Sequence, residues 1–159
     1  MSHWPTDYQA RLSGTSCSLC LEGRPRETRD RIRFSSSKLC DAYLHFRGVQ
    51  RGYATVIWRD GHAVEPTELT EEEAVGFWLE VLRVGRAMQT YYRPLKMNYQ
   101  LMGNGQPHLH WLLAPRFGDD VAPGVPLPAS GYTTFPDDEV RRDAQALAGL
   151  LEHTSWKGG

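Results

Sequence analysis

The chain has 159 residues and a formal net charge of −1, with 18 basic and 19 acidic side chains, which suits one domain and argues against an overall field that attracts nucleic-acid polymers. No window holds the roughly eighteen consecutive apolar residues that a membrane helix needs, and the N-terminus lacks a signal-peptide pattern. The three cysteines are an odd number, which together with the missing signal-peptide pattern predicts a cytoplasmic protein with reduced thiols. The missing apolar window predicts no membrane partner.

Residues 1–37 are predicted as loop, because Ser, Arg, Pro and Gly dominate them, with one short strand near Ile32–Phe34. The arginine-rich run 24–33 is interleaved with acidic residues, which favours a solvated loop. Two segments that follow, Leu39–Phe46 and Tyr53–Arg59, combine aromatic and β-branched residues around a glycine-containing turn. This pattern predicts an antiparallel β-hairpin.

A long helix is predicted from Thr70 onward. Thr70 and Glu73 form a capping-box pattern, in which each side chain can bond the backbone N–H of the other residue. Apolar residues then recur near helical spacing, at Val75, Trp78, Leu79, Leu82 and Val84. The helix should end near Tyr92, because Pro94 cannot continue it.

Two further strands, 96–102 and 108–116, are predicted on either side of a glycine-rich connection and form a second hairpin. A Pro- and Gly-rich arm should follow, and Asp137 can cap a last helix through Leu151. The order strand, strand, helix, strand, strand, helix indicates an α+β fold with an antiparallel sheet, one long helix and a C-terminal helix. We expect one domain over residues 1–159.

Two histidines interrupt an otherwise apolar stretch, GQPHLHWLLAPR, at residues 105–116. Side chains of a strand alternate between its faces, so His108, His110 and Leu112 are expected on one face and the intervening apolar residues on the core face. Imidazole can act near neutral pH as a nucleophile, as a general acid or base, or as a metal ligand. The pattern therefore predicts a site for chemistry with a leucine at its third position.

This stretch resembles the defining strand of the histidine-triad (HIT) superfamily of hydrolases and transferases, in which three histidines alternate with apolar residues ahead of Pro-Arg. The match is complete except at Leu112. Similarity to bacterial members extends from Cys17 to Phe117, on Met97–Asn104, Gly52–Arg59, His62 and Glu65–Thr70. The resemblance implies a HIT-like fold with a motif-bearing core at about 17–117 and a C-terminal arm and helix at 118–159.

The resemblance also implies an enzyme that acts on a phosphoanhydride or phosphoramidate of a nucleotide-like small molecule. In such proteins the middle histidine, here His110, attacks the α-phosphorus, and His108 is a second catalytic candidate. Neighbouring amides hold the phosphate oxygens, which implies Asn98, Asn104 and Gln106 as substrate-binding residues. The alternative for these amides is to satisfy local turns. Family members are usually dimers across the long helix and a strand edge, so a homodimer is expected by resemblance.

Two departures from the family pattern leave alternatives open. Leu112, expected to lie beside the substrate, can neither donate nor accept a hydrogen bond, and the loss of a general acid would cost about 3–5 kcal/mol of transition-state stabilisation. Where many members place a ribose-binding aspartate, the sequence has His45-Phe46-Arg47. The alternatives are an enzyme repurposed to another reaction in a specialised biosynthetic pathway, with His110 as acid or base, and a zinc-braced nucleotide-binding protein with little turnover.

Cys17 and Cys20 form a C-x-x-C pair, which by itself suits a redox pair, half a zinc site or coincidence. The Ser- and Gly-rich context lacks the βαβ unit typical of a redox motif, which favours zinc. Several bacterial HIT proteins bind zinc through such a pair and two histidines, and the matching positions are His62 and His108. A closed Cys₂His₂ site implies a structural metal that braces the N-terminal segment and leaves His110 free.

Overall fold

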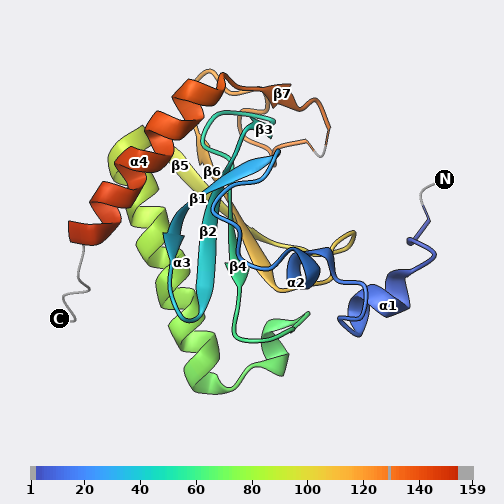
Figure 1. The fold of residues 1–159 in the computed structure, drawn as a ribbon. Helices are drawn as coiled ribbons and strands as arrows, with labels where there is room; N and C mark the ends of the chain where they lie inside the picture. Colours follow the sequence, from blue (N-terminus) through green and yellow to red (C-terminus); the bar gives the residue numbers. More distant parts are fainter. Residues whose placement is uncertain (1–2, 129, 154–159) are drawn as a thin grey trace.

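The computed structural model describes residues 3–128 and 130–153 (Figure 1). A five-stranded antiparallel sheet in the order β1-β2-β4-β6-β5 forms its centre. The strands are β1 (Arg31–Ser36), β2 (Cys40–His45), β4 (Ala54–Trp58), β6 (His110–Arg116) and β5 (Lys96–Leu101). Two short strands, β3 (Arg47–Gly48) and β7 (Thr133–Thr134), pair separately. The predicted α+β class with an antiparallel sheet is confirmed.

Both predicted hairpins are present, and pairing of β4 with β6 joins them. Thr55 of β4 lies opposite Tyr43 of β2 on one side and opposite Leu112 of β6 on the other. Leu112 in turn lies opposite Gln100 of β5. Directly opposite residues of neighbouring strands share a face, so these four side chains form a row across one face of the sheet.

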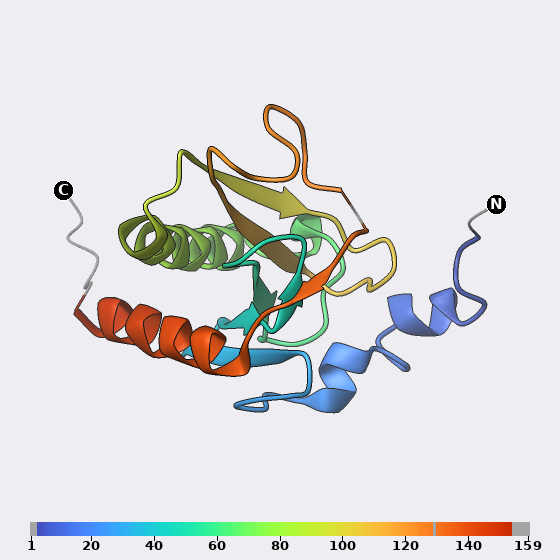
Figure 2. The same cartoon turned by 90° about the horizontal axis from the view of Figure 1, so that it is seen from above.

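Helices α3 (Glu71–Tyr92) and α4 (Asp137–His153) lie together on one side of the sheet (Figures 1 and 2). The predicted capping box of α3 is confirmed, because Thr70 Oγ1 accepts from the Glu73 amide and the Glu73 carboxylate accepts from the Thr70 amide. After Tyr92, Arg93 has a left-handed conformation with φ 48° and caps the helix ahead of Pro94.

The face of α3 that packs on the sheet differs from the predicted apolar positions. The buried residues are Phe77, Val81, Val84, Gly85, Ala87 and Met88. Val75 and Trp78 are exposed, although the Trp78 ring lies 4.9 Å from that of Trp111 at the margin of the sheet. Gly85 permits a close approach, because a Cβ there would lie 2.3 Å from the Tyr99 hydroxyl oxygen. The helix has apolar residues on more than one face, so spacing alone did not select the packed one.

Helix α4 is anchored by apolar residues and by one buried carboxylate. Asp143 accepts hydrogen bonds from the Arg51 guanidinium at 2.7 and 2.9 Å, from Tyr91 at 2.8 Å and from Tyr92 at 2.9 Å. Tyr91 and Tyr92 end α3 and Arg51 precedes β4, so this one carboxylate joins three parts of the chain. Burial by itself would raise the pKa of Asp143, but these donors hold it below its ordinary value.

The N-terminal segment is more regular than predicted. Two five-residue helices, α1 (Tyr8–Leu12) and α2 (Ser18–Glu22), precede β1 and lie on the other side of the sheet from α4 (Figures 1 and 2). Elements this short cannot display a recurring apolar stripe, so the sequence pattern missed them. The predicted short strand is confirmed as β1.

The predicted arm after β6 consists mainly of turns and bends. Elsewhere in the chain, a 3₁₀ helix η1 (Pro66–Glu68) precedes α3. The last helix of the prediction is confirmed as α4, whereas residues 129 and 154–159 of the predicted arm and helix lie outside the described residues. The single domain over 1–159 stays a prediction. No helix in the described ranges is both long and apolar enough to cross a bilayer.

Candidate active site and metal centre

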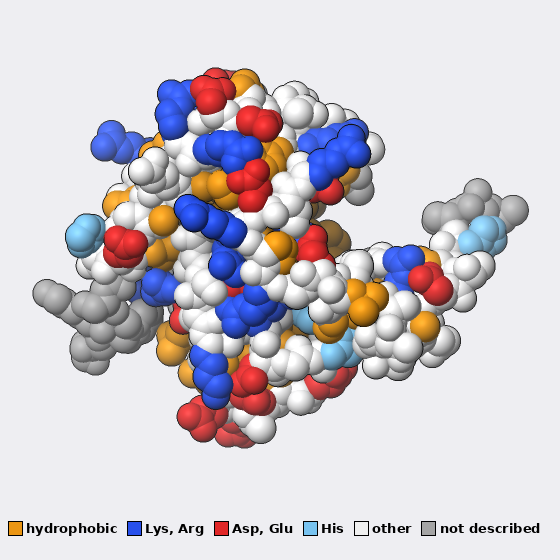
Figure 3. Space-filling model, viewed as in Figure 1, with side chains coloured by type: hydrophobic (Ala, Val, Ile, Leu, Met, Phe, Trp, Pro, Cys, Tyr) orange, Lys and Arg blue, Asp and Glu red, His pale blue; other side chains and the backbone are white. Residues whose placement is uncertain are grey.

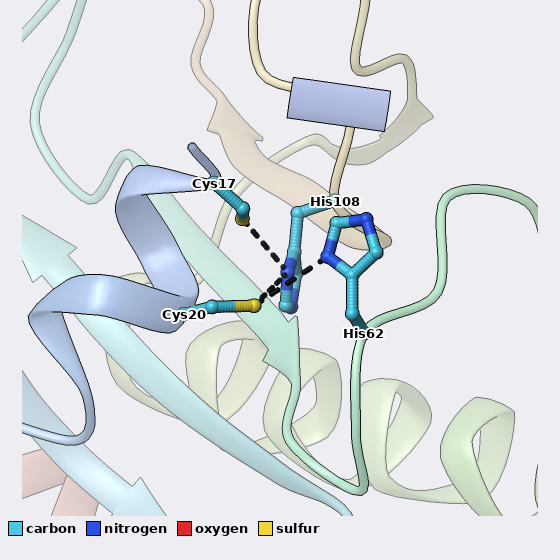
Figure 4. A group of neighbouring side chains, drawn as sticks. All are labelled: Cys17, Cys20, His62 and His108. Atoms are coloured by element: carbon cyan, nitrogen blue, oxygen red, sulfur yellow. Dashed lines mark hydrogen bonds between the residues drawn. The ribbon is translucent and has the colours of Figure 1, made fainter. Parts of the chain in front are cut away.

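Two cysteines and two histidines converge where α2 meets the start of β6 (Figure 4). One ligand atom from each of Cys17, Cys20, His62 and His108 lies within 4.8 Å of the other three. His108 Nδ1 is 3.4 Å from Cys17 Sγ and 3.5 Å from Cys20 Sγ. His62 Nδ1 is 3.4 Å from Cys20 Sγ. The structure therefore brings together all four predicted metal ligands, which we call the Cys/His cluster.

The second nitrogen of each imidazole is held by a backbone carbonyl. His108 Nε2 donates to the Trp58 carbonyl at 2.8 Å, and His62 Nε2 donates to the Leu12 carbonyl at 3.0 Å. A carbonyl only accepts, so each Nε2 carries the proton and each Nδ1 keeps its lone pair toward the sulfurs. Burial lowers the pKa of His108 to about 4, which keeps it in the neutral, ligating form. This donor set and its outer partners fit a tetrahedral metal ion.

The thiols need a cation to become ligands. Burial and the neighbouring Cys17 raise the pKa of the Cys20 thiol to about 11. A bound metal ion would favour the thiolate and release its proton, so metal affinity should increase with pH. Cys40, the third cysteine, is buried at the start of β2, where burial raises its pKa to about 12.

A buried carboxylate helps to hold the N-terminal segment against the sheet. Asp41 of β2 accepts from Arg24 at 2.8 and 2.9 Å and from Arg59 at 3.1 Å, and Arg33 lies 3.7 Å away. Arg59 also donates to the Leu19 carbonyl of α2 at 2.9 Å. Basic side chains gather over β1 in Figure 3. The prediction of a solvated arginine loop was therefore wrong in part, because a buried carboxylate requires cations beside it.

His110 lines a pocket of about 610 Å³, whose lining includes Ser18, Leu19 and Glu22. These residues belong to α2, which lies on the side of the sheet away from α4 (Figure 1). Its Nδ1 donates to the His108 carbonyl at 2.6 Å, which leaves the lone pair on Nε2. Burial lowers the pKa of His110, so its imidazole is neutral near pH 7. A neutral imidazole with a fixed tautomer can act as a nucleophile or as a general base.

The expectation that His108 and His110 share one strand face was wrong. Strand β6 begins at His110, and His108 lies in a bend before it, with its ring directed to the thiols. Both ring nitrogens of His108 have partners away from His110, because Nδ1 faces the two sulfurs and Nε2 donates to the Trp58 carbonyl. What His108 contributes at His110 is its backbone carbonyl, which no sequence pattern could have indicated.

The structure brings two of the four predicted substrate-binding residues to this pocket. Gln106 and Leu112 line it. Asn98 instead accepts from Arg116 at 2.6 Å and lines a separate cavity of about 600 Å³ beside β5. Asn104 is exposed in the turn between the two strands. A substrate role for Asn98 and Asn104 stays a prediction.

Further polar residues in the pocket were not predicted as site residues. His45, at the end of β2, has Nε2 3.1 Å from Thr55 Oγ1, and burial lowers its pKa to about 4. Arg31, Arg47 and Tyr132 also line the pocket. They come from β1, β3 and the arm, so only tertiary packing assembles them. The alternation that places His45 on the same face as Tyr43 was the one available signal.

Comparison with known proteins identifies the fold and the family. The chain resembles a histidine triad protein from Bradyrhizobium japonicum with a TM-score of 0.72, 23% identity and coverage of 81% of this chain and 96% of the other. It also resembles a histidine triad protein from Sinorhizobium meliloti 1021, with a TM-score of 0.72, 21% identity and coverage of 86% of this chain and 98% of the other. A third similar structure is a Zn-bound histidine triad family protein from Mycobacterium smegmatis, with a TM-score of 0.56, 21% identity and coverage of 91% of this chain and 94% of the other.

At these identities the solved structures establish the fold alone. No curated protein matches the chain. The family model described as the HIT domain matches residues 26–119, which include the strand that carries His110 and amount to more than half of the sequence. The chain therefore belongs to the HIT family.

Proposed function

We propose that the protein is an enzyme that cleaves or transfers at a phosphoanhydride or phosphoramidate of a nucleotide-like substrate, with His110 as its nucleophile. The observation that carries the proposal is the single hydrogen bond from His110 Nδ1 to the His108 carbonyl. It leaves the Nε2 lone pair on an imidazole that lines a pocket of about 610 Å³. Membership of the HIT family, which includes nucleotide hydrolases and transferases, supports this assignment.

In the proposed reaction, His110 Nε2 attacks phosphorus and forms a P–N bond. The bond from phosphorus to the leaving group breaks, and its electron pair departs with that group. The imidazole then carries positive charge, which the His108 carbonyl stabilises through Nδ1–H. Water or another acceptor attacks phosphorus next, the P–Nε2 bond returns its electron pair to His110, and the acceptor's proton passes to solvent.

Two pocket residues determine what this chemistry can use. Gln106 has an amide that can donate to a phosphate oxygen. Leu112 offers no proton to the leaving group, although it faces the pocket. Of the two proposed substrate classes, phosphoanhydrides should therefore react faster, because a phosphate or pyrophosphate departs without strong protonation whereas the amine of a phosphoramidate needs a proton.

We further propose that the metal of the Cys/His cluster is zinc and that its role is structural. Cys17, Cys20, His62 and His108 would hold it, and a four-coordinate site of this kind leaves no position for substrate. When bound, zinc would supply folding energy at the attachment of α2. Elemental analysis of protein expressed with sufficient zinc should give about one zinc per chain. Less than a tenth of that amount would contradict the assignment.

The proposal includes a homodimer in the cytoplasm. Strand β5 is at the edge of the sheet. Leu95 and Met102, which flank this strand, are exposed, and so is Trp78 of α3. An open strand edge bordered by apolar side chains favours pairing with a second copy. Sedimentation equilibrium should give twice the mass of the chain, and a monomer at micromolar concentration would contradict this part of the proposal.

The reaction is tested with a panel of adenosine phosphoramidates, nucleoside diphosphates and dinucleoside polyphosphates. Rapid acid quench followed by mass spectrometry should detect a nucleotidyl adduct on His110 of the wild type and none on His110→Ala. A substrate that turns over without an adduct, equally well in both proteins, would overturn the nucleophile.

A second candidate function, nucleotide binding with little turnover, is favoured by Leu112. It applies if the wild type binds adenosine 5′-monophosphate (AMP) but cleaves no member of the panel. A third, a different reaction that uses His110 as acid or base, applies if turnover needs His110 but forms no adduct.

A further inference from the structure

Helix α2 takes part in both the Cys/His cluster and the pocket. Cys17, which precedes it, and Cys20 contribute sulfurs to the cluster. Ser18, Leu19 and Glu22, which lie next to these cysteines in the chain, line the pocket that contains His110. Any change in the position of α2 that alters the cluster therefore also moves a wall of the pocket.

Helix α2 has few other attachments. Five residues amount to little more than one turn, which is not stable in isolation. Leu19 is the one buried residue within the helix, and the N-cap residue Cys17 makes no side-chain capping bond. The further contacts include a hydrogen bond from Arg59 to the Leu19 carbonyl and an ion pair between Glu22 and Arg31. A metal ion that joins both sulfurs to His62 and His108 would thus fix α2 relative to β4 and β6.

Gln106 links the cluster to the pocket directly. Its Oε1 accepts from Ser18 Oγ at 2.9 Å, and its Nε2 donates to Cys17 Sγ at 3.8 Å. An amide nitrogen has two hydrogens, so one can bond the sulfur while the other is directed to a ligand in the pocket that Gln106 lines. A metal-bound thiolate is a stronger acceptor than a thiol, so metal binding would fix this amide in its orientation.

We propose that a metal ion in the Cys/His cluster and an anionic ligand in the His110 pocket bind with positive coupling, and that Gln106 and α2 transmit it. Gln106 is then a positioning residue whose orientation depends on the cluster. Coupling between two sites is reciprocal, so each ligand raises the affinity for the other by one and the same factor. The inference rests on the proposed ligand pocket but not on the proposed reaction.

The test measures two affinities. The zinc affinity of the full chain is measured by competition with a chromophoric chelator, with and without saturating AMP. The affinity for AMP is measured by calorimetry with and without zinc, and inorganic phosphate is used as a second probe. We expect each ligand to raise the affinity for the other about tenfold, within the usual range of coupling. Amide exchange in residues 17–22 should slow when zinc is bound.

Two variants locate the coupling. Gln106→Ala keeps all four metal ligands, so it should still bind about one zinc per chain while the coupling falls below about twofold. Gln145→Ala makes the same change on the exposed side of α4 and should keep the full coupling. Circular dichroism confirms that both variants are folded.

Each possible failure has a distinct meaning. If zinc and AMP both bind but neither alters the other's affinity by more than twofold, the coupling is wrong and the proposed pocket stands. If Gln106→Ala couples like the wild type, Gln106 is not the link. If the zinc-loaded protein binds neither AMP nor phosphate, both the coupling and the proposed function are wrong, and if no zinc binds, the coupling is wrong.

Discussion

Helices α4 and α2 lie on opposite sides of the same sheet and are held there by different forces. Helix α4 has 17 residues and buries four apolar side chains, Val140, Ala144, Leu147 and Leu151. Full burial of a valine or leucine contributes about 1.5–3 kcal/mol, so this helix is stabilised largely by its apolar area. Helix α2 has five residues and buries one leucine, and its other attachments are polar.

The difference indicates where function can be located. An element stabilised by a broad apolar contact has one position, whatever binds nearby. An element stabilised by two sulfurs and a few hydrogen bonds has a position that depends on what those groups bind. Changes on the α4 side of the sheet should therefore alter stability alone, whereas changes on the α2 side should alter activity, binding or the metal-dependent part of stability.

The largest effect should come from removing the His110 imidazole, which lies on the α2 side of the sheet. His110→Ala should lower turnover by about a thousandfold or more, because the nucleophile is lost, while the melting temperature changes little. Steady-state kinetics and thermal unfolding of the same preparation measure both effects. If turnover on the best substrate is unchanged, the nucleophile must be assigned to another residue.

Loss of the Cys17 sulfur should show whether the metal contributes to stability or to the reaction. Cys17→Ser should remove zinc and lower the free energy of unfolding by more than about 2 kcal/mol, since a lost metal ligand is among the most destabilising changes. The turnover number at saturating substrate should decrease much less, because a closed site provides no Lewis acid. An equal collapse of turnover in folded protein would indicate a catalytic metal.

On the α4 side, Asp143→Asn should lower stability by about 1–3 kcal/mol at neutral pH and leave turnover per folded molecule unchanged. The pKa of Asp143 is held below its ordinary value in the folded state. Its contribution is therefore complete above the unfolded pKa, near 4, and is lost as the pH falls through the folded value. Urea unfolding between pH 7 and pH 2 should show the two proteins converging only in acid. A difference that is independent of pH would exclude the carboxylate charge as the cause.

The smallest expected effect concerns the third position of the motif. Leu112→His should raise activity toward adenosine phosphoramidates or dinucleoside polyphosphates about tenfold, because it places a proton donor one pleat from His110. Leu112→Asn, which adds a polar group that does not titrate, is the matched control and should gain less. A decrease in a wild-type activity that is already fast would mean that Leu112 shapes a substrate pocket.

Much of the fold was predictable because it depends on local patterns. Alternating and β-branched residues indicated both hairpins, and the Thr70–Glu73 box located the start of α3. The four ligands of the Cys/His cluster were predicted through resemblance to a family. The short helices α1 and α2 were missed, because five residues are too few to show a period.

The sequence by itself determined the element order, the α+β class and the identity of the residues that can do chemistry, because secondary structure and side-chain chemistry are properties of short segments. Only the tertiary structure decided that His108 directs its carbonyl to His110 and does not share a strand face with it, since this depends on where β6 begins. It also decided that Arg24 neutralises Asp41 and that Gln106, whose amide donates to Cys17 Sγ, connects the cluster to the pocket. These contacts join residues that are distant in the chain, and no local pattern records which distant groups will meet when the sheet is formed.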